Sequence, residues 1–352
     1  MPVAAAGAYL AWKGYNVEWV YALLALVGNV IFHAAGNVLS DWWDYRKGVD
    51  NEEAYAIPNL VFHQFEPTEY LKFSALLFGA GIAIGLLLTF LCGWKLLIVG
   101  IIGFILATSY SFFKFRGMGD IFVFTCFGVL PVIGTSFVAT GMIDWSILVL
   151  SVPLGVFTIA VLHNNNTVDI ATDKASGIHT LPMLLGEKVS VKLYIAYMVI
   201  PHLAVVVFCI LGLLPIWALL CILSAPAAYK NASAALGYFC SADSAGSAGG
   251  TGSADGAGSV GSAGSAGSAG SAGSAGSAGS AGSAGSAGSA GSAGSAGSAG
   301  SGFAGGAEKT SDIESGKKAG REALIGLDQK TAQLHLIFSV TLSIGLALAA
   351  II

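Results

Sequence analysis

Two segments rich in Asn and Asp lie at the ends of apolar stretches of this chain. The first reads Asn-Val-Leu-Ser-Asp-Trp-Trp-Asp from Asn37, and the second reads Asn-Asn-Thr-Val-Asp-Ile-Ala-Thr-Asp from Asn165. Carboxylates beside a membrane span are costly, so their presence points to a function that uses them. Carboxylate oxygens are ligands that Mg²⁺ prefers, and Mg²⁺ commonly bridges them to substrate phosphates. Two such segments around one cavity could therefore hold divalent cations against a diphosphate.

The first segment has a spacing that suits one face of a helix. Asn37, Asp41 and Asp44 follow an i, i+4, i+7 pattern, which on a helix places them on the same side. Asp50 comes after Gly48, where we expect the helix to have ended.

The second segment repeats this arrangement. Asn165, Asp169 and Asp173 follow an i, i+4, i+8 pattern, and Asn166 lies next to the first of them. Either the acidic residues are solvated side chains at helix ends, or they are ligands of a shared site. Two matched segments favour the second interpretation.

A third cluster carries positive charge and runs from Tyr110 to Asp120. Lys114 and Arg116 lie beside an apolar stretch, where they could neutralise a diphosphate leaving group, and Arg offers a bidentate fork. The alternative is that they only mark the cytoplasmic side of the membrane. The glycines before Asp120 predict a tight turn that opens the next helix. Aromatic residues surround these motifs and either line a path for an isoprenoid chain or form an interfacial belt: Trp42, Trp43, Tyr45, Phe112, Phe113 and Phe115.

The composition of the chain indicates a membrane protein, so membrane-spanning helices must position these charged and polar side chains. Hydrophobic residues make up 55% of the chain and charged residues 10%, where a soluble domain has roughly 25% charge. The five cysteines form no CxxC pair, so we interpret them as small buried residues. Eight stretches are long enough, or nearly so, to cross a bilayer, at about 20 residues each. They are 17–38, 70–93, 95–113, 119–141, 145–164, 190–212, 213–229 and 332–352, and Met1–Trp12 resembles the second half of a further, truncated helix.

Basic residues are distributed unevenly between the two ends of these stretches. Lys13 and Lys95 lie on one side, and the other Lys and Arg residues lie on the opposite side. The side richer in positive charge faces the cytoplasm. Both acidic segments and the Lys114/Arg116 pair belong to that side.

The chain divides into three parts. Residues 1–240 hold the first helices and both acidic motifs, 241–306 are a Ser/Ala/Gly tract, and 307–352 are a polar segment and the last helix. A tract of this composition is expected to be a flexible linker.

These motifs resemble those of the UbiA-type membrane prenyltransferases, over nearly all of the chain outside the tract. The first is similar to the family pattern N-D-x-x-D-x-x-x-x-x-D, with Ser40 at the Asn position and Asp50 at the end. The second, extended to Gly177 and beyond, is most similar to the 1,4-dihydroxy-2-naphthoate polyprenyltransferase branch. Residues 114–120 resemble the family element K-x-R-G-x-G-D, and 327–334 are typical of the same branch.

The resemblance implies an all-α, polytopic transmembrane bundle of nine helices around a central, lipid-accessible cavity. It implies Mg²⁺-dependent transfer of a polyprenyl group from its diphosphate to an aromatic quinone precursor, as in menaquinone biosynthesis. The expected location is a bacterial inner membrane, with the active site on the cytoplasmic face. Expected partners are the two substrates and the lipid bilayer, with no nucleic acid, and the oligomeric state is left open.

Residue roles follow from the motif match. The expected catalytic residues are Asp41, Asp44, Asp169, Asp173, Lys114 and Arg116, and the four aspartates are also the expected Mg²⁺ ligands. The expected substrate-binding residues are Asn37, Asp50, Tyr110, Asn165, Asn166, Lys174 and His179.

Two alternatives differ in class or in acceptor. An ion-coupled transporter would also carry carboxylates within a membrane, although nearer the midplane. Other prenyltransferases of the same type would use another acceptor, such as 4-hydroxybenzoate.

Overall fold

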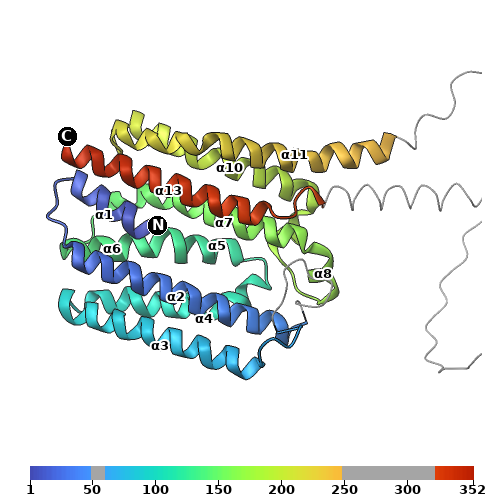
Figure 1. The fold of residues 1–352 in the computed structure, drawn as a ribbon, viewed down its shortest axis with the longest axis horizontal. Helices are drawn as coiled ribbons and strands as arrows, with labels where there is room; N and C mark the ends of the chain where they lie inside the picture. The colour runs from blue at the N-terminus through green and yellow to red at the C-terminus, as the bar shows by residue number, and fades with distance from the viewer. Residues whose placement is uncertain (49–59, 248–321) are drawn as a thin grey trace, which may run out of the picture.

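The structure, a computed structural model, describes residues 1–48, 60–247 and 322–352. Within these ranges the chain is helical and forms no sheet (Figure 1). The longer α-helices are α1 (Pro2–Trp12), α2 (Trp19–Arg46), α3 (Pro67–Cys92), α4 (Lys95–Lys114), α6 (Leu130–Thr140), α7 (Ser151–Val168), α10 (Glu187–Ile210), α11 (Ala225–Ser247) and α13 (Leu327–Ile351). Shorter elements are α5 (Gly119–Val123), the π-helix η1 (Phe124–Val129), the 3₁₀-helices η2 (Trp145–Leu150) and η3 (Ile216–Ser224), α8 (Ile170–Ala175) and α9 (Leu181–Leu185).

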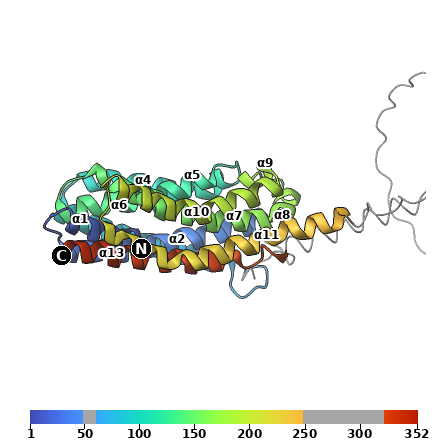
Figure 2. The ribbon, with the colours of Figure 1, turned by 90° about the horizontal axis from the view of Figure 1, so that it is seen from above.

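Seven helical segments among the described residues are long and apolar enough to cross a membrane. They are α2, α3, α4, the continuous run from α5 to α6, the run from η2 to α7, α10 and α13. They lie side by side along the long axis of the molecule (Figures 1 and 2). The prediction of an all-α transmembrane bundle is therefore confirmed. The apolar stretch predicted as a span at 213–229 is divided between η3 and the start of α11, which continues to Ser247.

Local signals set where these helices begin and end. The N-terminus of α3 has a capping box, in which Glu66 and Glu69 bond to each other's backbone N–H groups, and Pro67 occupies the first turn. The first acidic helix, α2, ends at Arg46, and Gly48 follows with a φ of 70°. This end is the one that the sequence predicts.

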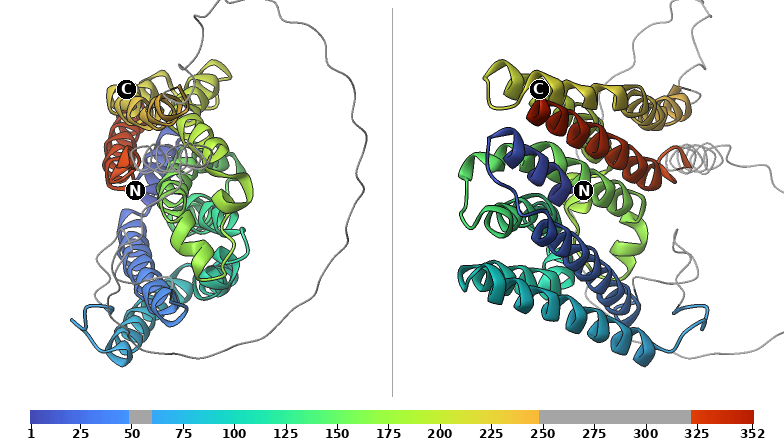
Figure 3. Two further views of the ribbon diagram at one scale, coloured as in Figure 1. Left: turned by 90° about the vertical axis from the view of Figure 1, so that its right-hand side faces the viewer. Right: turned by 60° about the vertical axis from the view of Figure 1, so that its left-hand side comes forward.

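The helix α7 is the central helix of the bundle. It packs against α10, α13 and η1. Half of its membrane window is buried, whereas only 6% of the window of α4 is. Viewed from its end, the bundle places α2 and α13 along one side and the middle of the chain along the other (Figure 3, left). The second acidic segment thus follows the most buried of the seven candidate membrane spans.

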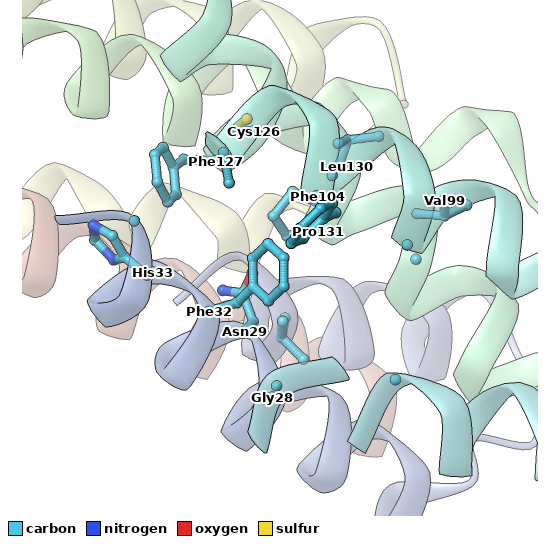
Figure 4. A pocket seen from close by; sticks show the side chains of 18 of the residues that line it. Gly28, Asn29, Phe32, His33, Val99, Phe104, Cys126, Phe127, Leu130 and Pro131 are labelled. Atoms are coloured by element: carbon cyan, nitrogen blue, oxygen red, sulfur yellow. The ribbon is translucent and has the colours of Figure 1, made fainter. Parts of the chain in front are cut away.

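The close contact between η1 and α7 depends on two glycines. A Cβ atom at Gly155 would lie 2.6 Å from the ring of Phe124, and one at Gly128 would lie 3.0 Å from the Cα atom of Gly155. The π-helix precedes Pro131, which has no N–H to donate to the carbonyl four residues before it. The local widening of the helix turns Cys126 and Phe127 towards the interior (Figure 4).

The predicted domain layout stays a prediction, because most of the Ser/Ala/Gly tract lies outside the described residues. The helix α11 includes the first residues of this tract, up to Ser247. Asp50, predicted to bind substrate, also lies outside the described part of the chain.

Candidate active site

A buried ion pair joins the ends of α2 and α4. The Nζ atom of Lys114 donates to Oδ2 of Asp44 at 2.9 Å, and the two side chains are 11% and 12% exposed. The other carboxylate oxygen of Asp44, Oδ1, is buried and has no hydrogen-bond partner among the described residues. Asp41, one turn earlier and exposed, interacts electrostatically with both members of the pair. A lysine that is distant in sequence is therefore a partner of the first acidic motif.

The second motif contributes Asp173 to the same group. This residue lies in α8, is 2% exposed and accepts a hydrogen bond from Thr180 at 3.1 Å. The pKa of Asp173 is raised to about 6, mainly by burial. The charge of Asp44 also raises this pKa, whereas the positive charge of Lys114 and the hydrogen bond from Thr180 lower it. Asp44 and Asp173 thus lie within electrostatic reach of each other and of one lysine.

Hydrogen bonds between loops hold the two motifs together. The hydroxyl of Ser176 donates to the backbone carbonyl of Gly48 at 2.9 Å. The backbone N–H of His179 donates to the carbonyl of Phe115 at 3.1 Å. The backbones of Arg116 and His179 pair as an isolated parallel β-bridge. All three charged segments of the sequence therefore meet at one end of the bundle.

Other charged residues predicted for the site lie at its surface. Arg116 is exposed, with its guanidinium 3.7 Å from the ring centroid of Phe112, so it is held over an aromatic face. Lys174 and His179 are exposed as well. Asp169 is half-buried at the junction of α7 and α8.

The aspartates are not assembled into a finished metal site. Across residues 1–48, 60–247 and 322–352, no three His, Cys, Asp or Glu side chains are arranged to hold a metal ion. Lys114 instead supplies the positive charge beside Asp44. The acceptor oxygens that the chemistry of Mg²⁺ requires are present, and the buried Oδ1 of Asp44 still lacks a partner.

An apolar cavity of about 830 Å³ lies between the helices (Figure 4). Its wall includes glycines of α2, α3 and α4, among them Gly28, Gly85 and Gly100, and the rings of Phe32 and Phe104. Glycines leave space that any other residue would fill, so these helices form a wide channel.

Three predicted substrate-binding residues line this cavity, namely Asn37, Tyr110 and Asn165. Asn166 is buried and is not part of the wall. Because Tyr110 and Asn37 lie within about two turns of Lys114 and Asp44 on their helices, the cavity leads towards the charged group.

Two pairs of polar residues near the site were missed by the sequence analysis. Oδ2 of Asp120 and Nδ1 of His163 form a hydrogen bond of 3.3 Å. The other ring nitrogen of His163, Nε2, lies 3.2 Å from the backbone carbonyl oxygen of Ser190. Asp328 and His335 of α13 also line the cavity. The sequence signals for the second pair are its i, i+7 spacing and, for Asp328, the resemblance of residues 327–334 to the naphthoate branch.

With the fold and the charged group established, comparison with known proteins assigns the class. The chain matches the UbiA prenyltransferase family over residues 1–237 and belongs to that family. It is 34% identical over 218 residues to "UbiA prenyltransferase domain-containing protein 1" of Danio rerio, which covers 60% of this chain and 63% of the relative. It is 26% identical over 225 residues to "1,4-dihydroxy-2-naphthoate octaprenyltransferase" of Bacillus subtilis (strain 168), covering 62% and 72%.

A solved structure shows the same fold. The apo structure of a UbiA homolog from Aeropyrum pernix K1 has a TM-score of 0.55 at 19% identity, covering 67% of this chain and 86% of that one. The match to the Danio rerio relative spans less than two thirds of that protein.

Proposed function

We propose that this protein transfers a polyprenyl group from polyprenyl diphosphate to 1,4-dihydroxy-2-naphthoate, a step of menaquinone biosynthesis. The observation that carries the proposal is the grouping of Asp44, Asp173 and Lys114 near an apolar cavity, whose wall includes Asn37 and Tyr110 of the same two helices as Asp44 and Lys114. A diphosphate head and an isoprenoid tail require this combination of a charged end and an apolar channel. The Bacillus subtilis relative, named for octaprenyl transfer to this acceptor, supports the choice of substrate.

The acidic residues would hold Mg²⁺ on the diphosphate. Asp41 and Asp44 from α2, with Asp169 and Asp173 from the α7–α8 junction, are the proposed ligands, and Mg²⁺ when bound would stabilise negative charge on the leaving group. The unpartnered Oδ1 of Asp44 fits this role, because a buried carboxylate oxygen without a partner is costly.

Positive side chains would bind the diphosphate directly. Lys114 is held beside Asp44 and within electrostatic reach of Asp173, which supports a role in which its ammonium group would stabilise the charge that develops on the leaving oxygen. Arg116, exposed at the rim, would bind the outer phosphate through its guanidinium. Lys174 and His179 lie in the neighbouring loop and would add donors.

The apolar wall would protect the reacting carbon from water. The C–O bond of the donor breaks and its electron pair leaves with the diphosphate, so the prenyl carbon becomes an allylic cation. The ring carbon that bears the carboxylate attacks this cation. The bond from that carbon to the carboxylate then breaks, CO₂ leaves, and the electron pair of the broken bond restores the aromatic ring. The rings of Phe32 and Phe104 make this wall apolar and offer water no hydrogen-bond partner, so water competes less for the cation.

The proposal includes the orientation of the protein in the membrane. The charged end carries most of the Lys and Arg residues, so we place it on the cytoplasmic side. The relatives come from animals and from bacteria. The distribution of Lys and Arg supports this orientation.

The test is a substrate panel with the purified full-length protein. It is incubated with Mg²⁺, a polyprenyl diphosphate and either 1,4-dihydroxy-2-naphthoate or 4-hydroxybenzoate, and products are identified by mass spectrometry. The expected product is the decarboxylated, prenylated naphthoquinol, and it should be absent with EDTA and in Asp41→Ala. A prenylated 4-hydroxybenzoate alone would reassign the acceptor, and no prenylated product from either ring would refute the proposal.

A further inference from the structure

The last helix, α13, presents polar groups to the cavity that have no partner. Asp328, Ala332 and His335 all line the cavity wall. Their i, i+4, i+7 spacing explains why they share one face of the helix. Oδ1 of Asp328 and Nε2 of His335 are buried, and neither has a hydrogen-bond partner within the described ranges.

Two other histidines packed between the helices, His163 and His202, bond through both ring nitrogens. His163 pairs with Asp120 and with the carbonyl of Ser190. His202 pairs with the carbonyl of Met198 and, at 2.8 Å, with the hydroxyl of Ser224. A buried polar atom left unpaired costs about 1–3 kcal/mol. The unpaired nitrogen of His335 therefore points to a ligand.

Contacts with α7 fix the depth of these groups. At the charged end, the side-chain amide of Asn164 donates to the carbonyl of Leu324 at 3.2 Å, just before α13 begins. Deeper in the membrane, the ring of His335 stacks on Phe157 with centroids 5.8 Å apart. A helix rises 1.5 Å per residue, so His335 lies about 10 Å deeper than Asp328. One polar group is thus near the mouth of the cavity and the other well inside it.

The residue between the two polar groups is small. Ala332 lies on the same face as Asp328 and His335, and its small side chain takes up little of the space beside them. We refer to this part of the cavity wall, formed by Asp328, Ala332 and His335, as the slot. On the facing helix, Asn165 lines the cavity at the charged end. The slot therefore has a small apolar residue between two polar ones, and Asp328 is its end nearer to the charged group.

We propose that Asp328 and His335 bind the aromatic acceptor through its ring hydroxyl groups, with the ring lying against Ala332. This inference rests on the proposed function and assigns the acceptor side of the same site. A hydroxyl of the ring would donate to Nε2 of His335 or to the carboxylate of Asp328. These bonds draw the hydroxyl proton away from the ring oxygen, which makes the ring more electron-rich and a better nucleophile.

The slot also has a consequence for specificity. A site built to accept hydrogen bonds discriminates strongly against an analogue that cannot donate them, because its own polar groups then stay unpaired. The dimethyl ether of the acceptor, 1,4-dimethoxy-2-naphthoate, has nearly the same ring and no hydroxyl hydrogen to donate. It should bind at least about tenfold more weakly, the factor expected for loss of one hydrogen bond.

The experiment compares three variants of the full-length protein in detergent micelles or nanodiscs. His335→Phe keeps an aromatic ring against Phe157 and removes the nitrogens, and Ala332→Leu fills the slot. His202→Phe is the matched control, because His202 also packs against Phe157 and is not part of the cavity wall. Equilibrium binding of the dihydroxy acid and of its dimethyl ether is measured without donor, and KM values for acceptor and donor are measured with it.

We expect His335→Phe and Ala332→Leu to weaken acceptor binding by at least about tenfold and to leave the KM of the donor within about twofold. His335→Phe should also abolish the preference for the dihydroxy acid over its ether. His202→Phe should keep that preference, whatever its effect on stability. Unchanged acceptor binding in both variants, or equal binding of the two acids by the wild-type protein, would overturn the inference.

The wild-type measurements separate this inference from the proposed function. If the wild-type protein binds the dihydroxy acid yet transfers no prenyl group to it, the proposed function fails and the binding site stands. If transfer occurs and the variants match the wild type, only the binding site fails. If His335→Phe does not fold, Ala332→Leu and the wild-type preference between the two acids still decide the matter.

Discussion

Replacing Lys114 by methionine should destabilise the protein by about 3 kcal/mol or more. Lys114 is the cation beside Asp44, at 2.9 Å, and both side chains are almost 90% buried. Removing one partner of a buried ion pair typically costs 3–5 kcal/mol, because the remaining charge stays buried and uncompensated. The cost should be felt fully here, since Oδ1 of Asp44 already has no partner among the described residues.

The double variant Lys114→Met/Asp44→Asn separates stability from chemistry. Neutralising Asp44 removes the stranded charge, so about 2 kcal/mol of the lost stability should return. Transfer activity should remain absent, because both a proposed diphosphate contact and a proposed metal ligand are gone. Lys47→Met is the control, since Lys47 is exposed at the same end and its loss should change stability by less than about 0.5 kcal/mol.

The assay is reversible unfolding in mixed micelles, combined with prenyl transfer measured on the folded fraction. A Lys114→Met variant as stable as Lys47→Met would refute the reasoning, because the ion pair would then contribute nothing. A double variant no more stable than the single one would refute it too, since the loss would come from packing of the lysine stem and not from charge.

Three further predictions test the site, the packing and the channel. Asp173→Ala should lower prenyl transfer more than about a hundredfold and leave the protein folded, and near-normal transfer by this variant at saturating Mg²⁺ would contradict the role of Asp173. In the wild-type protein, EDTA should abolish transfer and added Mg²⁺ should restore it. Gly155→Ala should destabilise the fold by about 1–3 kcal/mol, measured by unfolding, because its Cβ would lie 2.6 Å from the ring of Phe124. Gly85→Leu should raise the KM of long prenyl donors more than that of short ones, whereas Gly79→Leu on the same helix should not, because both sites have open space and only Gly85 lines the cavity.

Much of the scaffold could be predicted because it depends on local pattern. Long apolar stretches require helices in a bilayer, and the end of α2 follows from Gly48. The i, i+4, i+7 spacing places Asn37, Asp41 and Asp44 on one side of α2, whereas the second set, predicted to lie on one helix, runs across the junction of α7 and α8. These signals are contained within single segments, so no contact between segments had to be known.

The features that were missed depend on contacts between distant segments. The sequence does not show that Lys114 pairs with Asp44 or that Asp120 meets His163, since each pair joins two helices. In the sequence, His335 is one polar residue in a largely apolar helix. Only the structure shows that His335 lines the cavity and that its Nε2 atom has no hydrogen-bond partner among the described residues. A pattern of hydrophobicity alone also does not predict that the apolar stretch 213–229 is divided between η3 and α11.

The glycine-bearing helices α3 and α4 have a consequence for how such a protein can diversify. Few residues of these two helices are buried, 17% and 6% of their membrane windows, yet one side of each faces the channel. The charged groups lie at one end of the bundle, and on α4 the nearest of them, Lys114, is 14 residues or about 21 Å from Gly100. Substitutions at positions such as Gly85 or Gly100 can therefore shorten or bend the space for the tail without disturbing the reacting groups. Substitutions in the α3–α4 hairpin can therefore change the length of the lipid tail that fits during evolution, while the residues of the charged group stay the same.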